Sequence, residues 1–120
     1  MLAKIPWVAL ALLHFAPALA LFRPATLTTL YGLPANSPLL PLMQHRAALF
    51  VCIVIAAVWA AFDPDVRKLS VVLIGTSMLA FLAIYLLQGQ PLGLRSIAIA
   101  DLIGLPFLLW AGYLAFAGTR

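Results

Sequence analysis

Four long apolar stretches, separated by polar segments, dominate the hydrophobic pattern of this chain. A helix that crosses the roughly 30 Å hydrocarbon core of a bilayer needs about 20 mostly apolar residues. Because backbone groups in lipid must find hydrogen-bond partners within their own segment, we expect helices rather than open strands. The pattern therefore predicts four transmembrane helices, over residues 5–22, 38–62, 69–87 and 97–117.

Two of the three connections are short. Residues 63–68 (DPDVRK) and 88–96 (QGQPLGLRS) carry charges, Gly and Pro, as expected of turns between antiparallel helices. Short turns place consecutive helices side by side, and four such helices pack as an up-down bundle. The predicted fold is all-α, an integral-membrane, antiparallel four-helix transmembrane bundle that forms a single domain over residues 1–120.

The first connection is long, rich in Pro and still apolar. It runs over residues 23–43, and a helix start is predicted at Ser37 and Pro38, an N-cap residue followed by a first-turn proline. The segment around residues 27–33 is predicted to be a short helix at the membrane interface, with Tyr31 as an anchor at the level of the headgroups.

Composition supports the membrane interpretation. The chain is 66% hydrophobic and 8% charged, with a mean hydropathy of +1.15, whereas soluble domains carry about 25% charged residues. A soluble fold of this size cannot bury two thirds of its residues. The net charge of +4 comes from basic residues scattered singly between apolar runs, which indicates membrane-interface anchors and excludes a nucleic-acid-binding surface.

The start of the chain has a second interpretation. Lys4, the apolar run after it and the small residues at 18–20 (ALA) resemble a secretory signal peptide with its cleavage site. The run continues to Phe22, which favours a first transmembrane helix; cleavage within residues 1–20 stays open as the alternative.

Basic residues predict the orientation. The end that holds both termini and the second turn carries four of them, and the other end carries three, so the termini are predicted to be cytoplasmic. Aromatic side chains near the termini, at Trp7, Trp59, Trp110 and Tyr113, suit an interfacial belt there. The four basic residues at the end with the termini are Lys4, Arg67, Lys68 and Arg120. The three at the other end are Arg23, Arg46 and Arg95.

Ionisable residues within a span are costly and face protein or water. Arg46 follows the start of the second helix and Asp101 follows the start of the fourth. Both starts lie on the same side of the membrane, so the two charges should meet at similar depth, where Arg suits a bidentate carboxylate pair. The pair either locks two helices together or lines a polar pocket that binds a ligand headgroup.

Other polar residues are predicted at the same end of the bundle, and His14 stands apart. His45 precedes Arg46 and is either an interfacial residue or a proton-transfer group. His14 lies near Pro17, which invites a kink, and is either a structural histidine or part of a mid-depth cavity. The ligand-binding candidates are Arg46, Asp101, His45, Gln88, Tyr85, Tyr31 and His14.

Several kinds of chemistry have no support. The chain lacks phosphate-loop, dinucleotide-binding, zinc-protease and hydrolase-elbow motifs. The two His residues and Asp101 lack metal-ligand spacing on one helix, so neither a metal nor another cofactor is predicted. The single Cys52 excludes an intrachain disulfide.

Three short motifs carry a family resemblance. LYGLP (30–34), QHRAALF (44–50) and ADLIGLP (100–106) resemble small four-helix bacterial inner-membrane proteins, broadly like the DoxX group. The resemblance implies a multi-pass protein of the bacterial inner membrane and supplies no catalytic residues. Some proteins of this sort are labelled phosphopantetheine adenylyltransferase, but this chain lacks the HxGH nucleotide motif and the α/β pattern of that soluble enzyme.

These features predict a non-catalytic membrane protein that binds membrane lipid or an apolar, quinone-like ligand, or that is an accessory subunit of a membrane complex or a homo-oligomer. One alternative is an enzyme acting on a lipid or isoprenoid, with His45 as general acid and base. The other is a proton-coupled carrier that uses Asp101 and His14.

Overall fold

The described part of the chain is mostly helical. A computed structural model of the protein describes residues 2–23, 25, 32, 34 and 36–117, and these contain no strand. The predicted interfacial helix around residues 27–33, apart from Gly32, lies outside the described residues. The long helices are α1 (Ile5–Ala18), α3 (Leu40–Phe62), α4 (Arg67–Leu87) and α5 (Arg95–Phe116).

Three of these helical segments are long and apolar enough to cross a membrane, namely Leu40–Phe62, Pro64–Leu87 and Arg95–Phe116. Helix α1 has only 14 residues, but 3₁₀ turns at Leu2–Lys4 and Leu19–Leu21 extend it at both ends. At about 1.5 Å per α-helical residue and 2.0 Å per 3₁₀ residue, the extended segment is about 33 Å long.

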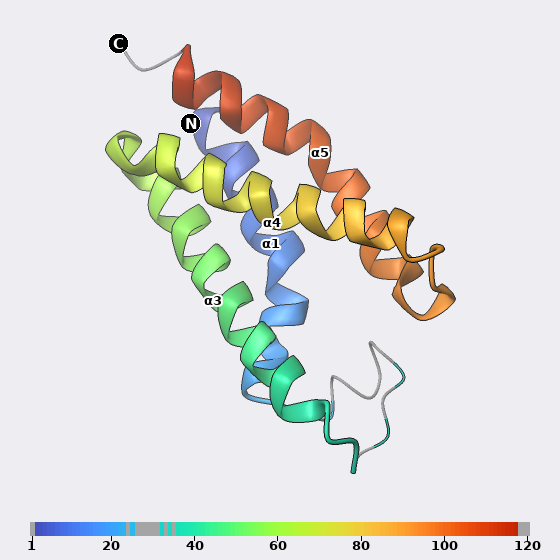
Figure 1. Cartoon of the computed structure of the whole chain (residues 1–120). Coiled ribbons are helices and arrows are strands. Elements are labelled where there is room, and N and C mark those ends of the chain that lie inside the picture. Colours follow the sequence, from blue (N-terminus) through green and yellow to red (C-terminus); the bar gives the residue numbers. More distant parts are fainter. Residues whose placement is uncertain (1, 24, 26–31, 33, 35, 118–120) are drawn as a thin grey trace.

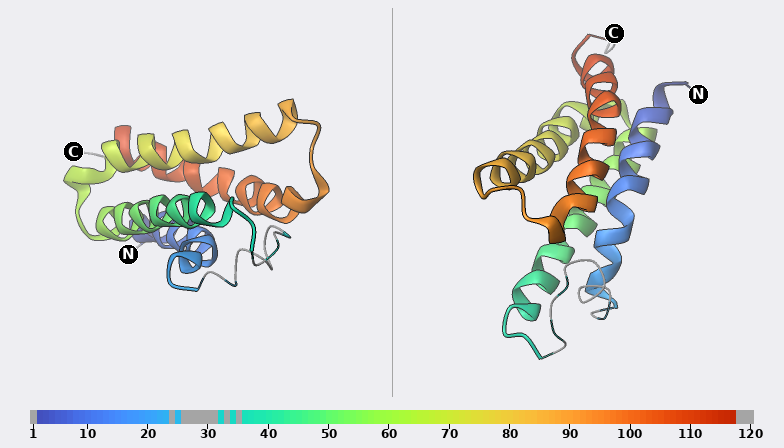
Figure 2. Two further views of the ribbon diagram at one scale, coloured as in Figure 1. Left: turned by 60° about the horizontal axis from the view of Figure 1, so that its bottom comes forward. Right: turned by 90° about the vertical axis from the view of Figure 1, so that its right-hand side faces the viewer.

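The helices run alternately up and down, as the short turns predict (Figure 1). Helix α1 packs against α3 and α5, and α4 packs against α5 and, less closely, against α3. The N-terminus, the α3–α4 turn and the end of α5 lie at one end of the bundle (Figures 1 and 2). Two cation–π contacts join these parts, from Lys4 to Phe62 at 4.5 Å and from Lys68 to Phe116 at 5.8 Å.

Small residues let the helices approach closely. The core contains Ala57, Ala60 and Ala61 of α3 and Ala111 and Ala115 of α5, all fully buried. Small residues of this kind form close helix contacts in membranes, where packing rather than the hydrophobic effect drives association. Most of the remaining apolar surface is exposed, since only 22–28% of the most apolar window of each candidate span is buried.

The position of Trp7 differs from the prediction, which put this residue in an interfacial belt. It is fully buried in the core, and its Nε1 has no hydrogen-bond partner among the described residues. Trp59, Trp110 and Tyr113 are exposed, as a belt requires. Trp7 and Leu10 lie on the same buried face of α1. The Trp7 ring therefore packs into the core and does not reach the membrane interface.

Two helix boundaries near prolines differ from those predicted. The α-helical hydrogen bonding of α1 ends at Ala18, one residue after Pro17, and continues as a 3₁₀ turn, because proline removes a donor and disfavours the preceding turn. Helix α3 begins at Leu40 rather than residue 38. The Ser37 hydroxyl accepts a hydrogen bond from the Leu39 amide at 3.2 Å, so it forms a turn before the helix instead of capping it.

The α3–α4 turn is held by polar side chains. Asp63 accepts hydrogen bonds from the Asp65 amide at 2.9 Å and from Trp59 Nε1 at 3.2 Å. Arg67 donates through Nε to the carbonyl oxygen of Ala60 at 2.7 Å, and thereby satisfies one of the last carbonyls of α3. The turn therefore joins α3 and α4 firmly at this end.

The α4–α5 turn begins with a glycine cap. Gly89 has a φ of +82°, a conformation that favours glycine. The Gln90 amide donates to the Tyr85 carbonyl at 2.9 Å, and the Gly89 amide donates to the Leu86 carbonyl at 3.3 Å. This pair of bonds is a Schellman motif, and it ends α4 at Leu87 as the sequence predicts.

Replacing Arg67 tests the α3–α4 turn. We expect Arg67→Met to lower the free energy of unfolding by about 1.5–3 kcal/mol, because the α3 carbonyl groups that accept hydrogen bonds from Arg67 lose their charged donor. Lys68→Met removes the same charge one residue later, where the side chain is exposed and contacts the Phe116 ring at 5.8 Å; it should lower stability by no more than about 0.5–1 kcal/mol. Unfolding in mixed micelles measures both; equal losses would contradict the role of Arg67.

Gly104 and Gly112 form a second test, on helix packing. A Cβ atom at Gly104 would lie 2.7 Å from Met78 Cε and 3.0 Å from Leu13 Cδ1, whereas one at Gly112 would lie 3.7 Å from Val71. Both Gly→Ala changes gain about the same helix propensity. We expect Gly104→Ala to be less stable than Gly112→Ala by about 1–3 kcal/mol, because only at position 104 would the added methyl group overlap neighbouring side chains. Equal unfolding free energies would show that α5 has room at Gly104.

Candidate functional site

A groove lies between α3 and α4, on the side where the two helices diverge. The helices meet at their turn and separate toward their far ends (Figure 1). The groove has a volume of about 510 Å³, within the usual range for small-molecule sites. It is lined by Arg46, Leu49, Phe50, Cys52, Ile53, Leu73, Thr76, Ser77, Phe81 and Ile84.

A second cavity continues the groove toward the turn. It has a volume of about 370 Å³ and shares Cys52 and Leu73 with the first. Its far end is lined by Trp59 and Val66. From Arg46 to Trp59 the two cavities follow α3 for about 20 Å, which exceeds half of the roughly 30 Å hydrocarbon core.

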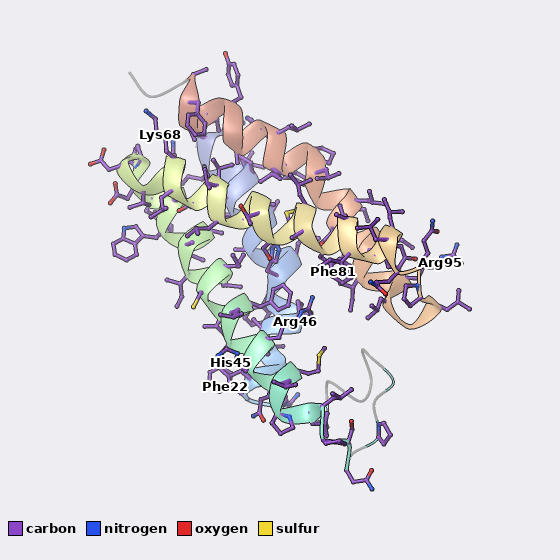
Figure 3. All side chains as sticks on the ribbon, in the orientation of Figure 1. Phe22, His45, Arg46, Lys68, Phe81 and Arg95 are labelled. Carbon is purple, nitrogen blue, oxygen red and sulfur yellow. The ribbon has the colours of Figure 1, made fainter. Side chains whose placement is uncertain are left out.

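Arg46 has aromatic rings on both neighbouring helices. Its guanidinium carbon lies 4.7 Å from the ring centre of Phe50 in α3 and 5.5 Å from that of Phe81 in α4. Both distances are within the range of cation–π attraction, which stabilises a cation in apolar surroundings. Figure 3 shows Arg46 and Phe81 close together between their helices.

These two phenylalanines connect Arg46 with other predicted site residues. Phe81 stacks on Tyr85 with ring centres 6.2 Å apart, and Phe50 lies 5.8 Å from the ring of His14. The structure therefore brings Tyr85, Arg46 and His14 into one chain of contacts across α4, α3 and α1.

Asp101 lies near Arg46 but is not in the groove lining. It lies on α5 three residues from each of the buried Ala98 and Gly104, on the inner stripe of the helix. The Arg46 charge acts on the Asp101 carboxyl group. The structure records no direct hydrogen bond or ion pair between these two described side chains. Their common depth in a membrane stays a prediction.

His14 is a buried residue with a structural hydrogen bond. It is 2% exposed, and its Nδ1 donates to the Leu10 carbonyl oxygen at 2.8 Å, within its own helix. It does not line the Arg46 groove. Its position matches the structural alternative, with the partner on α1 itself.

The remaining candidates lie apart from the groove. His45 and Gln88 are exposed and do not line the groove. Figure 3 shows His45 on the side of α3 away from Arg46. Consecutive helical residues point about 100° apart, so only one of His45 and Arg46 can face the groove. Tyr31 lies outside the described residues.

Sequence reasoning missed Phe50 and Phe81, and the hydroxyl groups of Thr76 and Ser77. A signal was available for the two aromatic residues. Phe50 follows Arg46 by four residues and Phe81 precedes Tyr85 by four, a spacing that brings helical side chains together.

The candidate proton-transfer residue lies outside the groove. His45 is exposed and does not line it. Among the described residues, no group of three or more His, Cys, Asp or Glu side chains could hold a metal ion. What the arrangement offers chemically is an apolar channel with one guanidinium group in its wall.

Comparisons of the chain with protein-family models, with curated proteins and with solved structures give no significant match. The resemblance to DoxX-like proteins stays a prediction, and function must be argued from the groove itself.

A double-mutant cycle tests the contact between Arg46 and Phe81. We expect Arg46→Met and Phe81→Leu to be coupled by about 0.5–2 kcal/mol in the free energy of unfolding, because each removes one partner of the same cation–π contact. Phe107→Leu, a change of the same size on α5, serves as the uncoupled control with Arg46→Met. A coupling energy near zero for the Phe81 pair would show that the ring only fills space.

Proposed function

We propose that this protein is a non-catalytic integral membrane protein that binds the apolar chain of a lipid-like ligand in the groove between α3 and α4. The observation that carries the proposal is the shape and lining of that groove. It is long, about 510 Å³ in its larger part and mostly apolar, and a cationic side chain lies in its wall. Ligand sites are typically apolar clefts with a few placed polar groups.

The surrounding surface supports a membrane location. Large apolar side chains are exposed along every long helix, among them Leu12, Ile55, Leu79 and Leu109. Exposed apolar surface of this extent is unfavourable in water and suits the bilayer, where lipid chains cover it. In this setting the groove opens sideways between two membrane-spanning helices, where an acyl chain can enter directly from the bilayer.

The proposed topology has four crossings with both termini in the cytoplasm of a bacterial cell. Helix α1 with its 3₁₀ extensions is about as long as the hydrocarbon core is thick. Lys4, Arg67 and Lys68 lie at the end of the bundle that holds the termini. Basic residues near helix ends favour the cytoplasmic side.

Filling the groove tests the proposed function. Ser77 lines the groove and Leu79 does not; the two residues point about 200° apart on α4. We expect native mass spectrometry to show co-purified lipid on the wild type and on Leu79→Phe. On Ser77→Phe, the fraction of protein with bound lipid should fall about tenfold, because the new ring occupies the space of the acyl chain.

Circular dichroism and thermal unfolding in the same detergent establish that both variants fold. Equal lipid retention by all three proteins would contradict the proposal, as would a wild type that retains no lipid. A dimer whose formation excludes lipid and is lost in Ser77→Phe would assign the groove to a helix of a second copy, and would also overturn it.

A further inference from the structure

Charge distribution along the groove distinguishes its two ends. Of the described residues that line the two adjacent cavities, Arg46 alone is charged, and it lies at the end farther from the α3–α4 turn. Apart from the hydroxyl groups of Thr76, Ser77 and Ser70, the Cys52 thiol and the Trp59 indole, the other described lining residues are apolar. A ligand with one polar end and one apolar end therefore fits the groove in a single direction.

Arg46 favours an anionic group at that end. A guanidinium group stays protonated in proteins and presents several N–H donors in a plane that matches carboxylate and phosphate oxygens. The rings of Phe50 and Phe81, at 4.7 and 5.5 Å, lie against the guanidinium carbon. Stacked rings hold the guanidinium in place, so binding an anion costs little side-chain ordering.

From the proposed function of the groove we infer its ligand class. We propose that the groove takes an amphiphile with a single acyl chain inside it and an anionic oxygen headgroup, a carboxylate or a phosphate, on Arg46. The chain runs from Arg46 past Cys52 and Leu73 toward Trp59. The roughly 20 Å between Arg46 and Trp59 accommodates a long-chain lipid tail.

Quenching of Trp59 fluorescence tests this inference. Trp59 lines the far end of the channel, and bromine atoms on an acyl chain quench a nearby indole. The probes are dibromostearic acid, its methyl ester, and lysophosphatidic acid with a brominated acyl chain, titrated at pH 8 into protein in an uncharged detergent. Trp59→Phe measures the quenching that arises from the other two tryptophans.

We expect both acids to bind wild type at least about tenfold more tightly than the methyl ester, in line with the strength of charged hydrogen bonds. Arg46→Gln should remove this preference and leave the affinity for the ester unchanged. A preference for stearic acid over lysophosphatidic acid identifies a carboxylate ligand, and the reverse order identifies a phosphate lipid.

Equal affinity for acid and ester in the wild type overturns the inference but leaves the proposed function intact, because the chain still binds. Absence of saturable quenching by any probe overturns both. Should Arg46→Gln fail to fold, Arg46→Lys keeps the charge but not the planar donors, and it should weaken the preference for the acids. An undiminished preference in Arg46→Lys contradicts the role of the guanidinium group.

Discussion

The close approach of α5 to its neighbours at Gly104 is the contact on which the rest of the structure depends. Met78 of α4 and Leu13 of α1 both reach the position where a side chain would begin. Helix α4 therefore lies against α5, and α1 lies between α5 and α3. Small residues at the contact, such as Gly104, allow the helices to approach this closely.

The groove follows from this packing. Helix α4 is joined to α3 near their turn, by Arg67 on the carbonyl of Ala60 and by Ser70 on the carbonyl of Ala56 at 3.3 Å. Farther from the turn α4 follows α5, while α3 follows α1 (Figure 2). The two helices diverge, and their separated faces line an apolar channel that ends at Arg46.

The position of Arg46 gives the channel its chemical direction. A cation in a membrane-spanning helix is costly unless nearby groups stabilise it. Here aromatic rings from two helices and the charge of Asp101 from a third surround it. The guanidinium lies in the wall of the groove, at the end farther from the α3–α4 turn.

The sequence by itself determined the helices, their number, their up-down order and the end at which Lys4 and Lys68 lie, because span length and turn chemistry are local properties. It also predicted a common depth for Arg46 and Asp101. Only the tertiary structure decided which faces meet: it buried Trp7, directed His45 away from the groove and brought Phe50 and Phe81 to Arg46. When nearly every face of a helix is apolar, hydrophobic periodicity cannot identify the packed face. That choice depends on helix crossings and close contacts such as the one at Gly104.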